Sequence, residues 1–372
     1  MRVLVAGDFA PRNRVAIQIE KGNYCCLDSV KELLSEVDYS VVNFESPIVS
    51  HDSLPINKTG PSLRCSIESM NCIAYTGFRC ITLANNHFRD YGEVGVSDTI
   101  DACLDAGLDF VGGGRSLNEA TRVLYKTING KCLAIINACE YEWSIATPIR
   151  GGSNPLDIVD ICRDIKEAKY KCDYLLLIIH GGVEWYNLPT PKMQKLYRFF
   201  VDQGADVIIN HHQHCISGYE VYNERPIFYG LGNFCFDKGK MERSFWNDGV
   251  IVLLEFDSNI RFSVIPIIQC VEDATVALCS EDGSILDKIR ELNAVINNPD
   301  LLESSFQKFI KEAGRSRLSV LQPWGGTVLE RFYSHGLLPG LLTREWKKRA
   351  LALFRCESHR EILLEYLENK FK

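Results

Sequence analysis

Residues 204–234, GADVIINHHQHCISGYEVYNERPIFYGLGNF, decide how the rest of the chain is interpreted. Three of the eight histidines, His211, His212 and His214, fall within four positions, one residue after the apolar run 207–209. Such a run predicts a buried strand that delivers side chains to a site. In an extended backbone alternate residues share a face, so we expect His212 and His214 to point together. This density of imidazoles favours a metal site over a His-rich surface turn, which is the alternative.

Composition places the chain among ordinary globular proteins. Its 372 residues are 46% hydrophobic and 24% charged, enough for more than one domain. The net charge is −7, with lysine and arginine scattered, so we expect no nucleic acid partner and no attraction to anionic membranes. The start, MRVLVAGD, resembles a core strand and not a leader, and apolar runs stay short of the roughly 20 residues that span a bilayer. We therefore expect a cytoplasmic protein without an integral membrane segment.

The fifteen cysteines are dispersed, and no CxxC pair occurs. Several lie within apolar runs, which indicates reduced, buried thiols in a chain that stays in a reducing compartment. A zinc knuckle built from four cysteines is disfavoured by the missing pair.

One pattern recurs along the chain. Five apolar runs end abruptly in polar residues, at positions 3–8, 41–45, 81–87, 175–182 and 207–214. Helical patterns lie between them at 26–36, 93–105, 156–169 and 192–203. Strands alternating with helices predict an α/β fold with a largely parallel sheet, in which ligands gather at the carboxyl ends of the strands. All five polar groups are expected at that edge.

Each polar group permits two interpretations. Asp8 and Glu45 are either hard carboxylate ligands at strand ends or ordinary turn and surface residues. Asn86 supplies an oxygen ligand and His87 a proton donor, or the pair forms a turn before a helix. Asp90 either orients His87 through its ring N–H or caps that helix.

His180 ends the most apolar run in the chain. It is either a metal ligand or a buried core histidine whose hydrogen bonds are satisfied. The two glycines that follow it favour the site, because they allow close backbone approach. Segments 250–256 and 261–268 alternate as a hairpin or an edge pair. Beyond about residue 271 the pattern becomes helical, which predicts a domain over 1–270 and a helical appendage over 271–372.

Seven segments match the motifs of a known family in order and spacing. They are GDFAP, NFESP, NKTGPSLR, LANNHFRDYG, DAGLDFVGGG, HGGVEW and the histidine stretch followed by RPIFYGLGNF. This set resembles CapA-type proteins, the poly-γ-glutamate capsule synthesis group of the calcineurin-like metallophosphoesterase superfamily. The resemblance covers about the first 270 residues. It implies a metallophosphatase-like sandwich of two β-sheets flanked by helices, with metals at the strand ends.

The resemblance also implies a role for each matched position. The implied metal ligands are Asp8, Glu45, Asn86, His180, His212 and His214. Among them Asp8 and His214 belong to the first metal, Glu45 bridges, and the others hold the second. His87 is the acid that protonates the leaving group. The implied cofactor is one or two divalent ions, Mn, Fe or Zn, which activate a hydroxide toward a phosphorus or carbonyl centre.

Three positions depart from the superfamily pattern. Ala10 stands where a histidine is usual, Glu45 replaces an aspartate, and His211 replaces a glycine. Fewer ligands then hold the first metal, so a mononuclear site or a site without catalysis is an alternative. An anionic small molecule or polymer is the expected substrate. The side chains expected to contact it are Arg12, Arg14, Lys58, Arg64 and Glu184, with solvated surface charge as the alternative for each.

The sequence leaves three functions open. The first is a metal-dependent hydrolase acting on a phosphoester or related bond in capsule or exopolymer synthesis. The second is a non-catalytic accessory protein that binds an anionic polymer, or a capsule-assembly partner through its C-terminal helical region. The third is an amide-bond hydrolase or transferase. The presence of His87 favours an enzyme, because a pure binding protein needs no proton donor.

Overall fold

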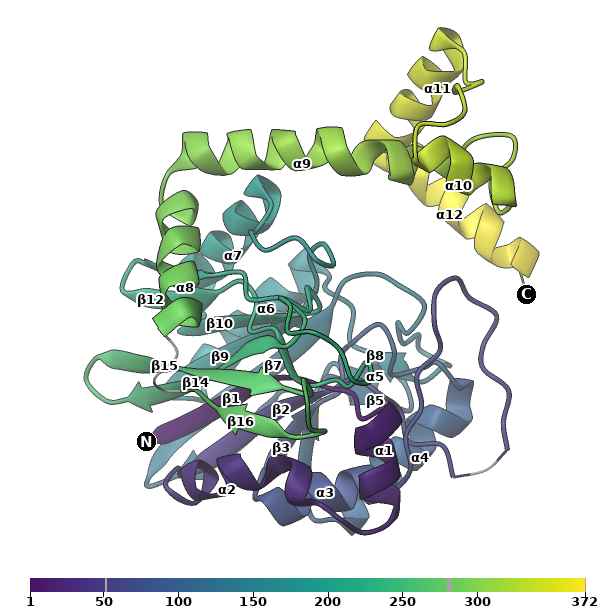
Figure 1. The fold of residues 1–372 in the computed structure, drawn as a ribbon. Helices are drawn as coiled ribbons and strands as arrows, with labels where there is room; N and C mark the ends of the chain where they lie inside the picture. The colour runs from purple at the N-terminus through teal and green to yellow at the C-terminus, as the bar shows by residue number, and fades with distance from the viewer. Residues whose placement is uncertain (51, 280–282, 372) are drawn as a thin grey trace. The chain divides into compact units, whose positions relative to one another are not determined.

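The computed structural model describes residues 1–50, 52–279 and 283–371. Two large β-sheets face each other and helices cover their outer faces (Figure 1). The predicted sandwich of two sheets flanked by helices is therefore confirmed. By its internal contacts the chain divides into two units, Met1–Leu302 and Glu303–Lys372. The last strand and the helix after it, which follow residue 270, thus belong to the first unit.

The first sheet is built around the N-terminal strand and has eight strands. Its order is β16 (Val276–Leu278), β15 (Ile260–Gln269), β14 (Asp248–Phe256), β1 (Arg2–Phe9), β2 (Tyr39–Phe44), β3 (Cys80–Thr82) and β4 (Asp109–Val111), with β13 (Asn233–Cys235) also paired to β1. The pairs from β1 to β4 are parallel, whereas β14, β15 and β16 are antiparallel. The predicted hairpin is the pair of β14 and β15.

The second sheet has six strands with a parallel centre. Its order is β11 (Tyr219–Tyr222), β12 (Arg225–Phe228), β10 (Val207–His211), β9 (Tyr174–His180), β7 (Lys131–Cys139) and β6 (Leu124–Ile128). The pairs among β7, β9, β10 and β12 are parallel, and only the outermost strands run antiparallel. A small sheet pairs β5 (Gly113–Gly114) with β8 (Gly152–Ser153). The largely parallel pairing expected from the sequence is found at the centres of both sheets, whereas the edge strands β6, β11 and β16 pair antiparallel.

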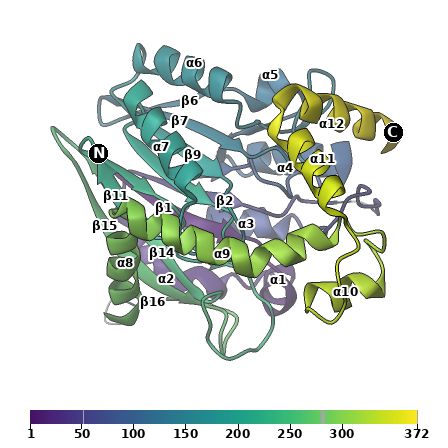
Figure 2. The ribbon, with the colours of Figure 1, turned by 90° about the horizontal axis from the view of Figure 1, so that it is seen from above.

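The helices of the first unit are α1 (Asn13–Glu20), α2 (Asp28–Ser35), α3 (Glu68–Thr76), α4 (Gly92–Asp105), α5 (Leu117–Ala120), α6 (Ile158–Lys169), α7 (Pro191–Gln203) and α8 (Gly283–Ile296), with a short turn η1 (Cys25–Leu27). Four of them match the predicted segments to within two residues. In α6 the buried side chains Ile161, Ile165 and Ala168 recur at helical spacing, and the Asp157 carboxylate caps the first turn. Helix α6 packs against β7 and β9, and α7 packs against β10 and β12. Figure 2 shows both helices from above.

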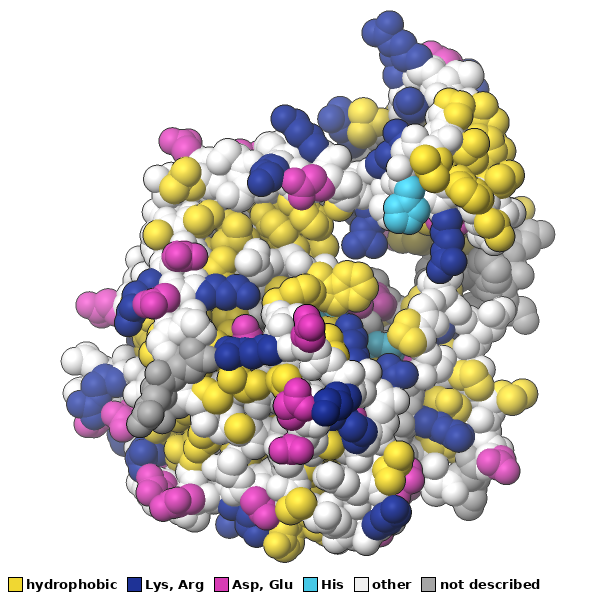
Figure 3. Space-filling view, viewed as in Figure 1, with side chains coloured by type: hydrophobic (Ala, Val, Ile, Leu, Met, Phe, Trp, Pro, Cys, Tyr) yellow, Lys and Arg dark blue, Asp and Glu magenta, His cyan; other side chains and the backbone are white. Residues whose placement is uncertain are grey.

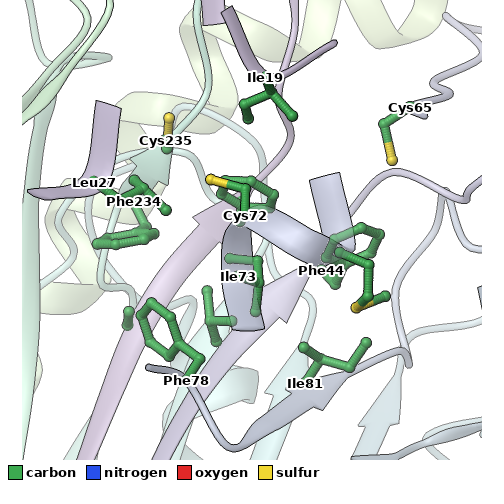
Figure 4. Packing of buried hydrophobic residues seen from close by; sticks show 14 of the residues in the cluster. Ile19, Leu27, Phe44, Cys65, Cys72, Ile73, Phe78, Ile81, Phe234 and Cys235 are labelled. Carbon is green, nitrogen blue, oxygen red and sulfur yellow. The ribbon is translucent and has the colours of Figure 1, made fainter. Parts of the chain in front are cut away.

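A continuous apolar core fixes the first sheet beneath α1 to α4. Phe44, Ile73, Phe78 and Phe234 are buried in it, and the rings of Phe78 and Phe234 meet edge to face at 5.5 Å (Figure 4). The central strands are buried on both faces, since helices cover one side and the second sheet the other. Their polar ends therefore emerge at one edge, and this burial positions the site.

The second unit is helical. It begins within α9 (Pro299–Ser319) and contains α10 (Val328–Ser334), α11 (Arg344–Arg355) and α12 (Glu357–Phe371). Among the helices that the structure describes, none combines the length and apolar character needed to cross a bilayer.

Candidate metal centre

The polar residues expected at the strand ends do meet. Asp8 lies near the end of β1, Glu45 directly follows β2, and Asn86 follows β3. His180 is the last residue of β9 and is in register with His211, the last residue of β10. The first and second sheets thus each contribute side chains to one place, and all of these side chains are buried.

Asp8, Glu45 and His214 form a cluster able to hold a metal ion, with one ligand atom from each within 4.8 Å of the others. Nε2 of His214 lies 3.6 Å from Oε1 of Glu45, and its Nδ1 lies 3.3 Å from Oδ2 of Asp8. Burial raises the pKa of Asp8, but the hydrogen bond from His214 and the neighbouring imidazoles outweigh it and lower the pKa below its ordinary value. Asp8 is therefore an ionised carboxylate, as a hard metal ligand must be.

A second group of ligand atoms shares Glu45. Nε2 of His180 lies 3.1 Å from Oδ1 of Asn86, 3.1 Å from Nδ1 of His212 and 3.8 Å from Oε1 of Glu45. Ligands at the usual zinc–nitrogen distance sit about 3.4 Å apart in a tetrahedron, so these separations fit a metal. Burial and the neighbouring His214 lower the pKa of His212 to about 3, so its imidazole is neutral and free to coordinate.

Glu45 provides the strongest test of whether a metal fits. Its side chain is fully buried, and neither carboxylate oxygen has a hydrogen-bond partner among the residues that the structure describes. Burial, and then the nearby carboxylates led by Asp8, raises its pKa well above the ordinary value. A buried carboxylate without a partner is strongly disfavoured, and a cation between the two ligand groups would remove that cost. The donor set therefore fits a divalent metal shared through Glu45.

Two of the histidines adopt an unusual backbone. The strand β10 ends at His211, and His212 and His214 have φ values of 90° and 53°. The expected extended backbone is therefore wrong for this segment, although the rings of His212 and His214 do lie together, with centroids 6.2 Å apart. Left-handed backbone at residues other than glycine costs roughly 1–3 kcal/mol each and recurs at functional sites.

His87 is held at the edge of the centre by a buried charge pair. Its Nδ1 lies 2.6 Å from Oδ2 of Asp90, while Lys58 pairs with the other oxygen of that carboxylate. Burial lowers the pKa of His87, with Asp90 opposing that shift. His87 directly follows Asn86, whose Oδ1 belongs to the second ligand group. Asp90 thus orients His87, as one of the two sequence-based interpretations expects.

Three of the residues expected to contact an anionic substrate make contacts within the protein instead. Lys58 is buried against Asp90, so its ammonium faces the His87–Asp90 pair and not open solvent. Arg14 pairs with the buried Asp237 at 2.7 Å and also donates to the carbonyl of Cys270, so its guanidinium supports the loop after β13. Arg64 lies over the Tyr91 ring at 5.9 Å.

Two of the expected substrate residues lie near the rim of the centre. Burial, and then the charge of Arg12, lowers the pKa of Lys238, whose ammonium lies 3.2 Å from the centre of the Trp246 ring. That ring lies 5.0 Å from the ring of His214. Glu184 raises the pKa of Glu45 and therefore also belongs to the surroundings of the centre.

Four residues that contact these ligands were given no role in the site by sequence reasoning. Asn43 donates to Oδ1 of Asp8 at 2.7 Å, and Oδ1 of Asn233 lies 2.9 Å from Nδ1 of His214. Glu142 lies 3.9 Å from Nε2 of His212, and His211 lies 3.6 Å from Asp8. Both asparagines are fully buried within apolar strands, and that combination is the signal that would have identified them.

The fold and the centre together define an α/β protein with carboxylate and imidazole ligands converging at its strand ends. The model of the family "Bacterial capsule synthesis protein PGA_cap" matches residues 2–238, and the chain belongs to this family. The matched segment contains all six ligand candidates and His87, so the family match and the geometry concern the same part of the molecule.

Curated relatives agree with this assignment. The chain is 34% identical over 218 residues to the capsule biosynthesis protein CapA of Bacillus anthracis, a match that covers 56% of this chain and 53% of that protein. It is 32% identical over 280 residues to the PGA biosynthesis protein CapA of Bacillus subtilis, covering 73% of this chain and 72% of that protein. The chain thus spans about half the length of the first relative and nearly three quarters of the second.

Among solved structures, a putative 5′-nucleotidase from Staphylococcus aureus matches with a TM-score of 0.45 and 12% identity, over 78% of this chain and 58% of that one. The family assignment rests on the sequence matches, and the ligand set rests on the distances within this molecule.

Proposed function

We propose that the chain is a metal-dependent hydrolase that acts on a phosphoester or related bond of an anionic precursor or polymer in capsule synthesis. The observation that carries this proposal is Glu45, a buried and unpartnered carboxylate between two groups of ligand atoms. Family membership supplies the biological setting. A proton donor held beside those ligands distinguishes this proposal from a simple binding role.

The residues divide the chemical work between them. Asp8, Glu45 and His214 would hold one divalent ion, and Glu45, Asn86, His180 and His212 would hold a second, with Mn, Fe and Zn as the ions suited to these donors. Such an ion stabilises negative charge as it develops on the substrate. Asn43 and Asn233 fix the orientation of the two ligands they contact, which lowers the cost of assembling the site.

His87 is the proposed acid for the leaving group. Asp90 contacts Nδ1 and opposes the lowering of the His87 pKa by burial, so it favours the doubly protonated ring, whose Nε2–H would pass its proton to the leaving oxygen. Lys58 pairs with the second oxygen of Asp90 and so keeps this carboxylate in place. Arg12 and Lys238 carry positive charge at the rim, where an anionic substrate would arrive.

The accessory role is favoured by one observation. Ala10 is buried in a small apolar cluster with Leu63, Phe236 and Trp246, and supplies no ligand to the Asp8 group. If three side chains bind the first ion too weakly, the centre becomes a binding site without turnover.

Metal content and turnover, measured together, test the proposal. Elemental mass spectrometry of the tag-free protein is expected to find one or two equivalents of metal, and His212→Ala with His214→Ala to remove them. His335→Ala with His359→Ala, which removes two exposed histidines, is the matched control and should retain the metal. With bis(p-nitrophenyl) phosphate and p-nitrophenyl phosphate as probes, His87→Ala should abolish turnover while its metal content stays unchanged. A metal-loaded protein that hydrolyses neither probe supports the accessory role and refutes the hydrolase.

A further inference from the structure

The net charge of −7 conceals an asymmetry between the two units. Residues 303–372 carry 13 lysines and arginines against eight aspartates and glutamates, a net charge of +5. The remaining residues therefore carry −12. The expectation of no anionic membrane partner followed from the net charge of the whole chain. It does not apply to the C-terminal unit considered alone.

The same unit exposes an unusual number of large apolar side chains. Among the described residues, fourteen are exposed within 303–372, against nineteen in the first 302. Tyr333 is the only buried large apolar residue of this unit among the side chains that the structure describes. Figure 3 shows hydrophobic side chains gathered over α10 and α11, with lysine and arginine beside them. Apolar surface of this extent on a small helical unit indicates an interaction site.

Helix α11 combines both properties in one element. Trp346, Leu353 and Phe354 recur at helical spacing and form an apolar face, and the exposed fractions of Trp346 and Phe354 are 38% and 47%. Lys347 and Arg349 border that face on its two sides by the same spacing. Aromatic residues on one face with basic residues along its borders are typical of helices that lie in the interface of a membrane.

We propose that α11 is a peripheral membrane-binding element whose partner is an anionic lipid surface. Its apolar face enters the boundary between headgroups and acyl chains, and Lys347 and Arg349 contact the lipid phosphates. This binding brings a unit of charge +5 to a negative surface, so the attraction is strongest at low ionic strength. The proposal does not depend on whether the metal centre is catalytic.

Other occupants fit these observations less well. A second copy of the unit carries the same positive charge, so self-association through this surface would bring like charges together. A nucleic acid would satisfy the basic residues but leave Trp346 and Phe354 without apolar contact. An anionic lipid interface satisfies both the charge and the apolar face.

Co-flotation of the full chain with vesicles tests the proposal. Binding is expected to vesicles of phosphatidylcholine that contain phosphatidylglycerol, and it should fall as salt is raised. Lys347→Gln with Arg349→Gln should weaken partitioning about thirtyfold, at about 1 kcal/mol for each charge. Trp346→Ser with Phe354→Ser should weaken it more than about tenfold.

A matched control separates position from overall charge. Lys166→Gln with Lys195→Gln removes two exposed charges from α6 and α7 and should leave vesicle binding unchanged. Helix content by circular dichroism should be equal in all variants. Equal binding to pure phosphatidylcholine, unchanged binding of the α11 variants, or dimer formation without vesicle binding would each overturn the proposal.

Discussion

Replacing Glu45 by glutamine separates the metal-binding role of this side chain from any role in the fold, because shape is retained and only charge is lost. Oε1 of Glu45 lies 3.6 Å from Nε2 of His214 and 3.8 Å from Nε2 of His180, so one substitution weakens both ligand groups. In the absence of metal the carboxylate has no hydrogen-bond partner among the described residues. Its charge therefore contributes no stabilising contact to the metal-free fold.

We expect opposite effects in the two states. Without metal, Glu45→Gln should be at least as stable as the parent, because an unpartnered buried carboxylate is costly. With free metal a thousandfold above its dissociation constant, the parent gains about 4.1 kcal/mol of stability. A dissociation constant weakened about a hundredfold leaves a gain of about 1.4 kcal/mol under the same conditions.

Urea unfolding with a chelator and with Mn²⁺ measures both quantities. Glu167→Gln, an exposed position on α6, serves as the control and should keep the full metal-dependent gain. The reasoning is refuted if Glu45→Gln also keeps that gain, or if the metal-free variant is the less stable protein. The first result would mean that Glu45 does not bind the metal, and the second that its carboxylate stabilises the metal-free fold.

Three further substitutions test the surroundings of the centre. Gly7→Ala would place a Cβ 2.1 Å from the carbonyl oxygen of Gly232, so we expect a loss of about 3 kcal/mol or more in urea unfolding. Lys58→Met leaves the buried Asp90 without its cation, and calorimetry should show about 3–5 kcal/mol of destabilisation. Arg14→Ala should cost about 3 kcal/mol at pH 7 by removing the partner of Asp237. Burial raises the pKa of Asp237, but hydrogen bonds led by Arg14 outweigh it and lower the pKa. The pair therefore stabilises above about pH 3.9, and the difference between parent and variant in acid unfolding should shrink as pH falls below that value.

Much of the fold follows from local pattern. β-branched apolar runs predict the central strands, and apolar residues at helical spacing predict α4, α6 and α7 to within two residues. Each of these patterns depends on neighbours a few positions apart, so the sequence alone expresses it. Abrupt polar endings also predict that Asp8, Glu45, Asn86 and His180 meet, because parallel strands end at one edge of a sheet.

Which residues contact one another within the site depends on residues that are far apart in the sequence. Arg14 and Asp237 are 223 residues apart, and nothing in either local pattern pairs them, so Arg14 is expected at the substrate and is found supporting a loop. The backbone of His212 and His214 leaves the extended conformation, which no two-residue alternation predicts.

The sequence by itself determined which residue types stand at the strand ends, since that depends only on where each apolar run stops. The tertiary structure alone decided that Glu45 is shared by two ligand groups, that Asn43 and Asn233 hold the ligands, and that Lys58 pairs with Asp90. Those outcomes arise from the packing of two sheets against each other, which brings together side chains that no local spacing relates.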